Sequence, residues 1–476
     1  MTSRMTAAAD VHGDVVHAGP TGYGRLAELL GASVASIGDW MSEYGDFEPH
    51  PSLDVPTADL RAAMDELHGR LRDNYPFFHP GYVGQMLKPP HPAALVGYLS
   101  AMLINPNNHA LDGGPATAEM EKEVVSAMAE MFGFSSHLGH LTTSGTIANL
   151  EALFVARETH PGRGIAHSVD AHYTHARMCR LLGMEAVAIP TTPAGTMDLD
   201  ALEQALKSER IGTVVATTGT TGLGAVDPVH EIVALCRRFG ARVHVDAAYG
   251  GFFRLIADDT DDGVESAPFL AIADVDSVVV DPHKHGLQPY GCGTVIFSDP
   301  GVARHYLHDS PYTYFTSDEL HLGEISLECS RAGAAAAALW LTLRVLPLTA
   351  DGLGAALRPG RRAALAWTER MTAGDEFVAY QQPQLDIISY FPNRARLSEV
   401  DKASARIMDA GMSLPKDQGL YVATYTVAAT ELRRRGHRVE TDLDSGRILR
   451  SVLMKPETEQ YVAVLHDRLV ALAGAT

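Results

Sequence analysis

Residues 242–251 read RVHVDAAYGG, a short apolar run that ends in a carboxylate at Asp246. Residues 277–285 read SVVVDPHKH and repeat the pattern, with a lysine at position 284 after the run. Short apolar runs rich in β-branched residues are typical of buried strands. Because a buried Asp or Lys is costly unless it is paired or used, Asp246 and Lys284 mark strand ends that carry chemistry.

Similar runs recur on both sides of these two segments. Between residues 115 and 350 they alternate with helical periodicity, as in the apolar face of a helix expected at 229–239. This alternation predicts an α/β fold with a mainly parallel sheet, whose ligands lie at the carboxyl ends of the strands. The expected strands are 186–190, 213–218, 242–246, 277–280 and 293–297.

The rest of the chain predicts four regions. Residues 1–20 are expected to form a flexible tail, and 21–110 a helical arm followed by a proline-rich ordered loop at 74–92. Residues 111–349 form the large domain. Residues 350–476 are predicted to be a small C-terminal α+β domain, with strands at 385–391 and 448–454 and a last helix after Pro456.

Composition narrows the class of protein. The 476 residues carry 38 Lys and Arg against 58 Asp and Glu, and the net charge of −20 disfavours binding to nucleic acid or anionic membranes. The four cysteines form no CxxC pair, so neither a disulfide framework nor a metal site is expected. The longest apolar run, 332–343, is too short to span a bilayer, and no signal peptide is visible. A cytoplasmic protein is expected.

The two strand ends point to one cofactor. Pyridoxal 5'-phosphate (PLP) needs a lysine for its Schiff base and a carboxylate beside its ring nitrogen. Asp246 would keep that nitrogen protonated, because an opposite charge favours the charged form. The alternative is that Asp246 and Lys284 merely pair with each other at the sheet end.

Three further segments fit the same pocket. Residues 141–149, LTTSGTIAN, place hydroxyls and Gly145 at a helix start, which suits either a phosphate cradle or an ordinary N-cap. His172 follows a short strand, where an imidazole can stack on an aromatic cofactor or serve only structure. Residues 216–222, ATTGTTG, end a strand in hydroxyl groups that can reach the ring or the phosphate.

The segments LTTSGTIANLEALFVAR, DAHYTHAR, ATTGTTGLGAVDP, HVDAAYGG and DPHKH resemble, in order and spacing, the group II PLP-dependent decarboxylases. That family includes glutamate, aspartate, cysteine-sulfinate and aromatic amino-acid decarboxylases. The likeness runs from about residue 75 to the C-terminus. It implies a PLP-dependent transferase-like fold (fold type I), with 111–349 as the PLP-binding domain. It also implies a homodimer with active sites at the subunit interface, and decarboxylation of an L-amino acid to its amine and CO2.

The resemblance also implies residue roles. Lys284 would be the Schiff-base lysine, Asp246 the partner of the ring nitrogen, and His172 the stacking residue and an acid–base candidate. Other residues would contact the cofactor: Gly145, Thr146 and His283 at the phosphate, and Thr220, Ala248 and Asp281 close by. The chain departs from the family at His285, where Trp is usual, and at Ile147, where an acidic residue is common.

In the family a loop tyrosine usually protonates the α-carbon after CO2 leaves. Tyr312 and Tyr314 are the candidates here, with a role as interface aromatics as the alternative. Loss of such a tyrosine in the family can divert the reaction toward oxygen and an aldehyde product.

Substrate choice is expected to depend on residues 79–88, HPGYVGQMLK, whose HPxYxxQ form resembles the acidic-substrate branch. Gln85 would bind a side-chain carboxylate, Lys88 would add positive charge or belong to a structural ion pair, and Arg450 would contact substrate carboxylate. Acidic substrates are therefore favoured, free or bound to a carrier protein. Aromatic decarboxylation and oxidative aldehyde formation are the alternatives.

Two other classes of protein are disfavoured. A non-enzymatic scaffold would have no need for Lys284, Asp246 and His172 together. A nicotinamide-binding protein would carry a GxGxxG motif between its first strand and helix, and this chain has none.

Overall fold

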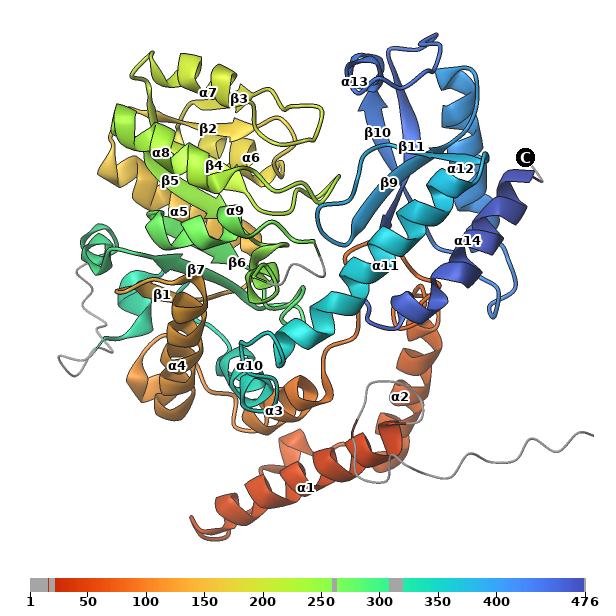
Figure 1. Cartoon of the computed structure of the whole chain (residues 1–476). Helices are drawn as coiled ribbons and strands as arrows, with labels where there is room; N and C mark the ends of the chain where they lie inside the picture. The colour runs from red at the N-terminus through yellow and green to blue at the C-terminus, as the bar shows by residue number, and fades with distance from the viewer. Residues whose placement is uncertain (1–15, 17–21, 259–262, 308–319, 475–476) are drawn as a thin grey trace, which may run out of the picture.

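The chain folds around two sheets that lie in separate lobes (Figure 1). The computed structural model describes residues 16, 22–258, 263–307 and 320–474. The tail expected at 1–20 lies almost wholly outside these ranges.

The large sheet has seven strands in the order β1-β7-β6-β5-β4-β2-β3. Strands β2 to β6 pair in parallel, whereas β7 runs antiparallel to both of its neighbours, β1 and β6. The prediction of a mainly parallel seven-stranded sheet is confirmed. The strands are β1 (Leu138–Thr142), β2 (Gly164–Ser168), β3 (Ala186–Ile189), β4 (Ile211–Thr217), β5 (Arg242–Asp246), β6 (Ser277–Val280) and β7 (Gly293–Phe297). The last three match the predicted ranges to the residue.

Helices cover both faces of this sheet (Figure 1), and the strands β4 and β6 are buried along their whole length. Along β6, Val278 and Val280 pack in the core formed with helices α4 and α8, while Val279 packs in the core formed with α5. The helices of this lobe are α4 (Pro115–Phe132), α5 (Gly145–Thr159), α6 (Thr174–Leu182), α7 (Leu199–Leu206), α8 (Val229–Phe239), α9 (Ser266–Leu270) and α10 (Gly333–Val345).

The second sheet is antiparallel, in the order β10-β11-β9-β8. Its strands are β8 (Phe377–Ala379), β9 (Ile387–Pro392), β10 (Ala423–Ala428) and β11 (Ser445–Val452). Trp367, Tyr390 and Leu465 are fully buried in its core. The helices of this lobe are α11 (Leu353–Ala373), α12 (Leu397–Met412), α13 (Ala429–Arg434) and α14 (Thr458–Gly474).

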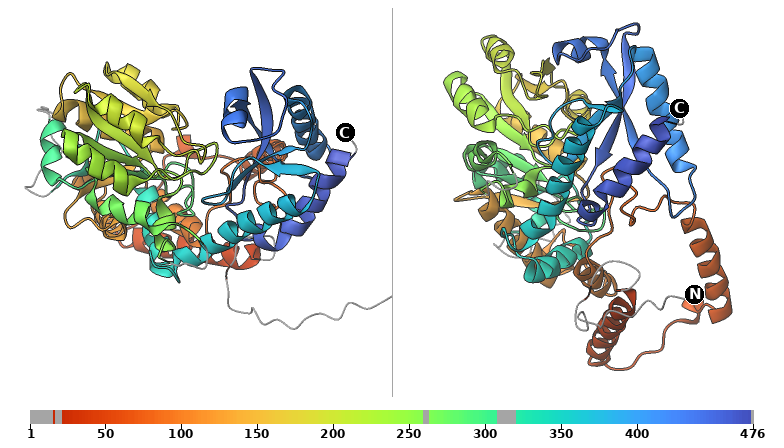
Figure 2. Two further views of the ribbon diagram at one scale, coloured as in Figure 1. Left: turned by 45° about the horizontal axis from the view of Figure 1, so that its top comes forward. Right: turned by 45° about the vertical axis from the view of Figure 1, so that its right-hand side comes forward.

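The N-terminal region forms two helices and a loop that joins the lobes. Helix α1 (Tyr23–Ser42) packs against α3 (Pro92–Met102), whereas α2 (Thr57–Leu71) has no buried residue and stands away from the body (Figure 2). The loop between α2 and α3 docks on the small lobe, where the Val83 N–H donates to the Tyr421 carbonyl at 2.9 Å. No helix in the described part of the chain is long and apolar enough to cross a membrane.

Candidate active site

A cavity of about 220 Å³ lies at the carboxyl ends of the parallel strands. Its walls come from the start of α5, the loop between β2 and α6, the ends of β4 and β5, and the turn after β6. Eight of the residues predicted to bind the cofactor line it: Gly145, Thr146, His172, Asp246, Ala248, Asp281, His283 and Lys284.

Asp246 is the last residue of β5, and its carboxylate is held from two sides. One oxygen, Oδ2, lies 2.9 Å from Nε2 of His175, and the other, Oδ1, accepts the Ala248 N–H at 3.2 Å. Burial alone would raise the pKa of Asp246, but the hydrogen bond and charge of His175 and the charge of Lys284 hold it below its usual range. The carboxylate is therefore ionised at neutral pH.

Lys284 pairs with a different carboxylate. Its Nζ lies 2.9 Å from Oδ2 of Asp281, and no ion pair within 4.0 Å joins it to Asp246. The alternative that Asp246 and Lys284 pair with each other is thus wrong. The other oxygen of Asp281, Oδ1, is buried and has no hydrogen-bond partner among the described residues.

The start of α5 approaches Asp281 closely. Ser144 caps the helix by accepting the Ile147 N–H at 3.3 Å. A Cβ at Gly145 would lie 2.5 Å from Oδ2 of Asp281, so only glycine fits there. The N–H groups of this first turn have no partner within the helix. Together with the helix dipole they would stabilise an anion at the N-terminal end of α5.

Two histidines border the cavity. Nδ1 of His172 accepts the Thr174 N–H at 3.3 Å, and burial is the main cause that lowers the pKa of this ring below 6.5. Nδ1 of His283 lies 2.7 Å from the Cys292 carbonyl, and burial lowers its pKa as well. Both rings are therefore neutral at pH 7.

These residues fit PLP. The cavity offers a lysine, an ionised carboxylate, a helix N-terminus that no Cβ fills, and two buried oxygens without a partner in the described structure, Oδ1 of Asp281 and Oγ1 of Thr217. Unpaired buried polar atoms are costly, and a polar cofactor would satisfy them.

One residue predicted to contact the cofactor is not part of the cavity wall. Thr220 does not line the cavity, because its hydroxyl turns inward and accepts the Ala225 N–H at 3.0 Å. Its neighbours Gly219 and Thr221 line the cavity instead. Tyr312 and Tyr314 fall outside the described residues.

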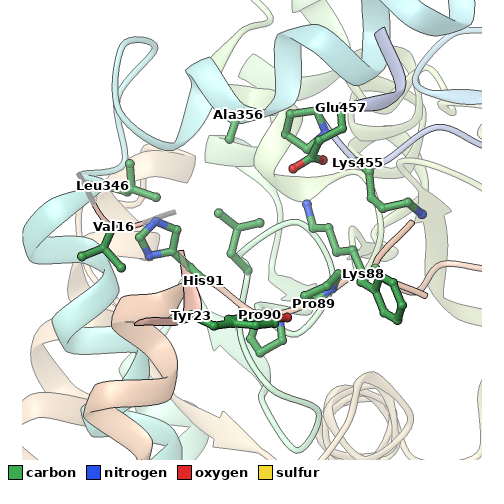
Figure 3. A pocket seen from close by; sticks show the side chains of 13 residues that line it. Val16, Tyr23, Lys88, Pro89, Pro90, His91, Leu346, Ala356, Lys455 and Glu457 are labelled. Carbon is green, nitrogen blue, oxygen red and sulfur yellow. The ribbon is translucent and has the colours of Figure 1, made fainter. Parts of the chain in front are cut away.

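Gln85 and Lys88 line two other pockets. Gln85 is exposed beside Tyr82 and Tyr421, in a pocket of about 280 Å³. Lys88 lines a pocket of about 440 Å³ shown in Figure 3, which Lys455 and Glu457 also line. The Lys88 ammonium donates to the Met454 carbonyl at 3.2 Å, and burial lowers its pKa to about 8. The structure thus does not bring Gln85 and Lys88 to the cofactor cavity, because their loop docks against the small lobe.

Arg450, on β11, connects the lobes. Its Nε donates to the Gly222 carbonyl and its Nη1 to the Gly84 carbonyl, both at 3.2 Å. Its Nη2 is buried without a partner among the described residues. Gly222 follows Thr221, which lines the cavity, but Arg450 itself is not one of the lining residues.

Sequence reasoning missed two groups near the cavity. His175, three residues after His172 in the HYTH segment, bonds to Asp246. The cavity residue Tyr249 donates its hydroxyl to Asp386 at 2.6 Å, and Nε2 of His285 lies 2.9 Å from the same carboxylate. The polar His285 side chain, unexpected at a family Trp position, is the one signal in the sequence that points to this network.

A lysine and a carboxylate at the carboxyl ends of neighbouring strands, on this sheet, define a PLP-dependent protein of fold type I. The family "Pyridoxal-dependent decarboxylase conserved domain" matches residues 79–391, about two thirds of the chain. The chain belongs to this family, whose cofactor is PLP.

Individual relatives carry two kinds of name. The L-tyrosine decarboxylase of Enterococcus faecium is 30% identical to this chain. The match covers 64% of this chain and 66% of that protein, so the chain spans just under two thirds of this relative. The L-aspartate decarboxylase of Thermococcus kodakarensis is 26% identical over 71% of this chain and 86% of that protein. The solved structure of Oryza sativa TDC with PLP and tryptamine superposes with a TM-score of 0.77 over 96% of this chain and 99% of that one, at 20% identity.

Proposed function

We propose that the protein is a PLP-dependent amino-acid decarboxylase that converts an L-amino acid into its amine and CO2. The observation that carries this proposal is that Lys284 and the ionised Asp246 line one cavity from neighbouring strand ends. Family membership supports the same reaction.

Six residues of the cavity have proposed roles in holding PLP. Bound PLP supplies an electron sink for the carbanion left when CO2 departs. Lys284 would hold the cofactor covalently, and Asp246 would keep a proton on the ring nitrogen. His172 would cover the ring, while the first turn of α5 with Gly145, Thr146 and His283 would bind the phosphate.

We propose an acidic substrate, aspartate- or glutamate-like. The unpaired Nη2 of Arg450 supports this choice, because a buried guanidinium donor suits a carboxylate. An aromatic substrate is the second candidate. The relatives named tyrosine decarboxylases favour it.

The test is CO2 release and product mass from PLP-loaded protein with aspartate, glutamate, cysteine sulfinate, tyrosine, dopa and tryptophan, with Lys284→Ala as the blank. Turnover of an acidic substrate supports the proposal. Aromatic turnover alone overturns the acidic choice, and an aldehyde product with oxygen uptake overturns simple decarboxylation. If none of the six amino acids releases CO2, decarboxylation of a free substrate from this panel is contradicted.

We further propose a homodimer. Helix α2 exposes four apolar side chains with helical spacing: Leu60, Met64, Leu67 and Leu71. Such a stripe on an unburied helix is typical of a surface that a second copy covers. Light scattering on the wild type and on Leu67→Lys tests this: a dimer that dissociates in the variant supports it, and a monomeric wild type contradicts it.

A further inference from the structure

His175 and Asp246 form a buried pair directly behind the cofactor cavity. His175 is the second residue of α6, and its side chain is fully buried, while that of Asp246 is 6% exposed. Nε2 of His175 lies 2.9 Å from Oδ2 of Asp246. Unlike Asp246, His175 does not line the cavity, so it acts on any ligand only through the carboxylate.

The geometry fixes which groups the imidazole can serve. Asp246 is the one described group that bonds to a ring nitrogen of His175, because Nδ1 is buried without a partner. An ionised carboxylate accepts only, so Nε2 must carry the proton in this bond. Oδ2 accepts this hydrogen bond. Oδ1 accepts the hydrogen bond from the Ala248 N–H and has a second lone pair free for another donor.

Other charged and titratable groups near Asp246 do not replace this bond. Lys284 pairs with Asp281, and His244 uses its two nitrogens on Ser277 and Asn149. His172 accepts a backbone N–H. The side-chain donor to Asp246 is therefore His175 alone among the described residues.

We propose that His175 is a positioning residue, which orients the Asp246 carboxylate and keeps it ionised so that Oδ1 can hold the proton on the cofactor's ring nitrogen. This inference rests on the proposed PLP site. It predicts that His175 sets the electronic state of the bound cofactor without touching it, as outer ligands of a metal site orient the inner ones.

Two substitutions separate this role from a packing role. In His175→Gln the side-chain amide reaches about as far as Nε2 and can donate to Asp246. In His175→Asn the amide is one methylene shorter and ends near the position of Nδ1. The matched control is His140→Asn, because His140 and Glu151 form another fully buried pair at 2.9 Å that does not line the cavity.

The measurements need no substrate: the PLP dissociation constant, and the pH midpoint at which the visible band of the bound cofactor changes. We expect His175→Asn to weaken PLP binding roughly 10-fold or more and to move the midpoint, because a charge-assisted bond is lost. His175→Gln should stay within about 3-fold of the wild type, and His140→Asn should change thermal stability alone.

Three outcomes would overturn the inference. They are wild-type binding and midpoint in His175→Asn, a Gln variant no better than the Asn variant, or an equal spectral change in His140→Asn. In an Asp246→Asn background the His175→Asn effect on PLP binding should vanish, and full additivity would also contradict the proposal. A protein that passes these tests but releases no CO2 refutes the proposed reaction and leaves the role of His175 standing.

Discussion

Replacing Gly145 with alanine should strongly weaken the binding of PLP. The added Cβ would lie 2.5 Å from Oδ2, 2.7 Å from Oδ1 and 2.9 Å from Cγ of Asp281. Ordinary contact begins at 3.4 Å, so the start of α5 or the Asp281 carboxylate must shift by about 0.9 Å. Either shift disturbs the site, because Asp281 pairs with Lys284 and the first turn of α5 is the proposed phosphate cradle.

A displacement of about 1 Å at a positioned group can cost roughly 100-fold. We therefore expect the PLP dissociation constant of Gly145→Ala to rise at least 10-fold in an absorbance titration. The control is Gly31→Ala in the middle of α1, where the new Cβ meets no atom within 4 Å. It should bind PLP normally and gain roughly 0.5–1 kcal/mol of stability from helix propensity. Wild-type PLP affinity in Gly145→Ala would refute the close-approach argument.

Three further predictions concern other parts of the chain. Burial alone would raise the pKa of Asp386, but the opposing effects, of which that of His285 is the largest, bring the pKa below its usual range. The ionised Asp386 therefore stabilises the folded protein above about pH 3.9, and this stabilisation is lost on acidification. Asp386→Asn should flatten the fall in Tm between about pH 5 and 3, and an unchanged slope would contradict this. Arg450→Gln should raise KM for an acidic substrate at least 10-fold with a smaller change in kcat; equal loss for aromatic substrates would exclude a bond from Arg450 to the side-chain carboxylate. Cys329 is the one exposed thiol of four, so a chromogenic thiol reagent should titrate one group in the native protein and four after unfolding.

The residues that line the candidate cofactor cavity could be predicted because their signal is local. Asp246 is the last residue of β5, Gly145 is the first residue of α5, and Lys284 lies in the turn that follows β6. The parallel sheet brings such ends together. The limits of β5 and β6 were predictable for the same reason: an apolar run stops at a polar residue.

Contacts between distant segments could not be predicted in this way. The Tyr249–Asp386 and His285–Asp386 bonds join residues 137 and 101 positions apart, and no periodicity encodes such a pairing. The placement of Gln85 and Lys88 depends on how their loop docks on the small lobe, so a motif alone could not tell which pocket they line. The strand β8 has only three residues, FVA, and is too short for its apolar run to be recognised as a strand.

The most direct test of the cofactor site is to reduce PLP-loaded protein with borohydride and to map the labelled lysine by mass spectrometry. Two other lysines compete, because burial lowers the pKa of Lys88 to about 8 and that of Lys455 to about 7 and leaves reactive amines near neutral pH. The account predicts a single label, on Lys284, which alone of the three shares a cavity with Asp246. A label on Lys88 or Lys455, with Lys284 unmodified, would contradict it.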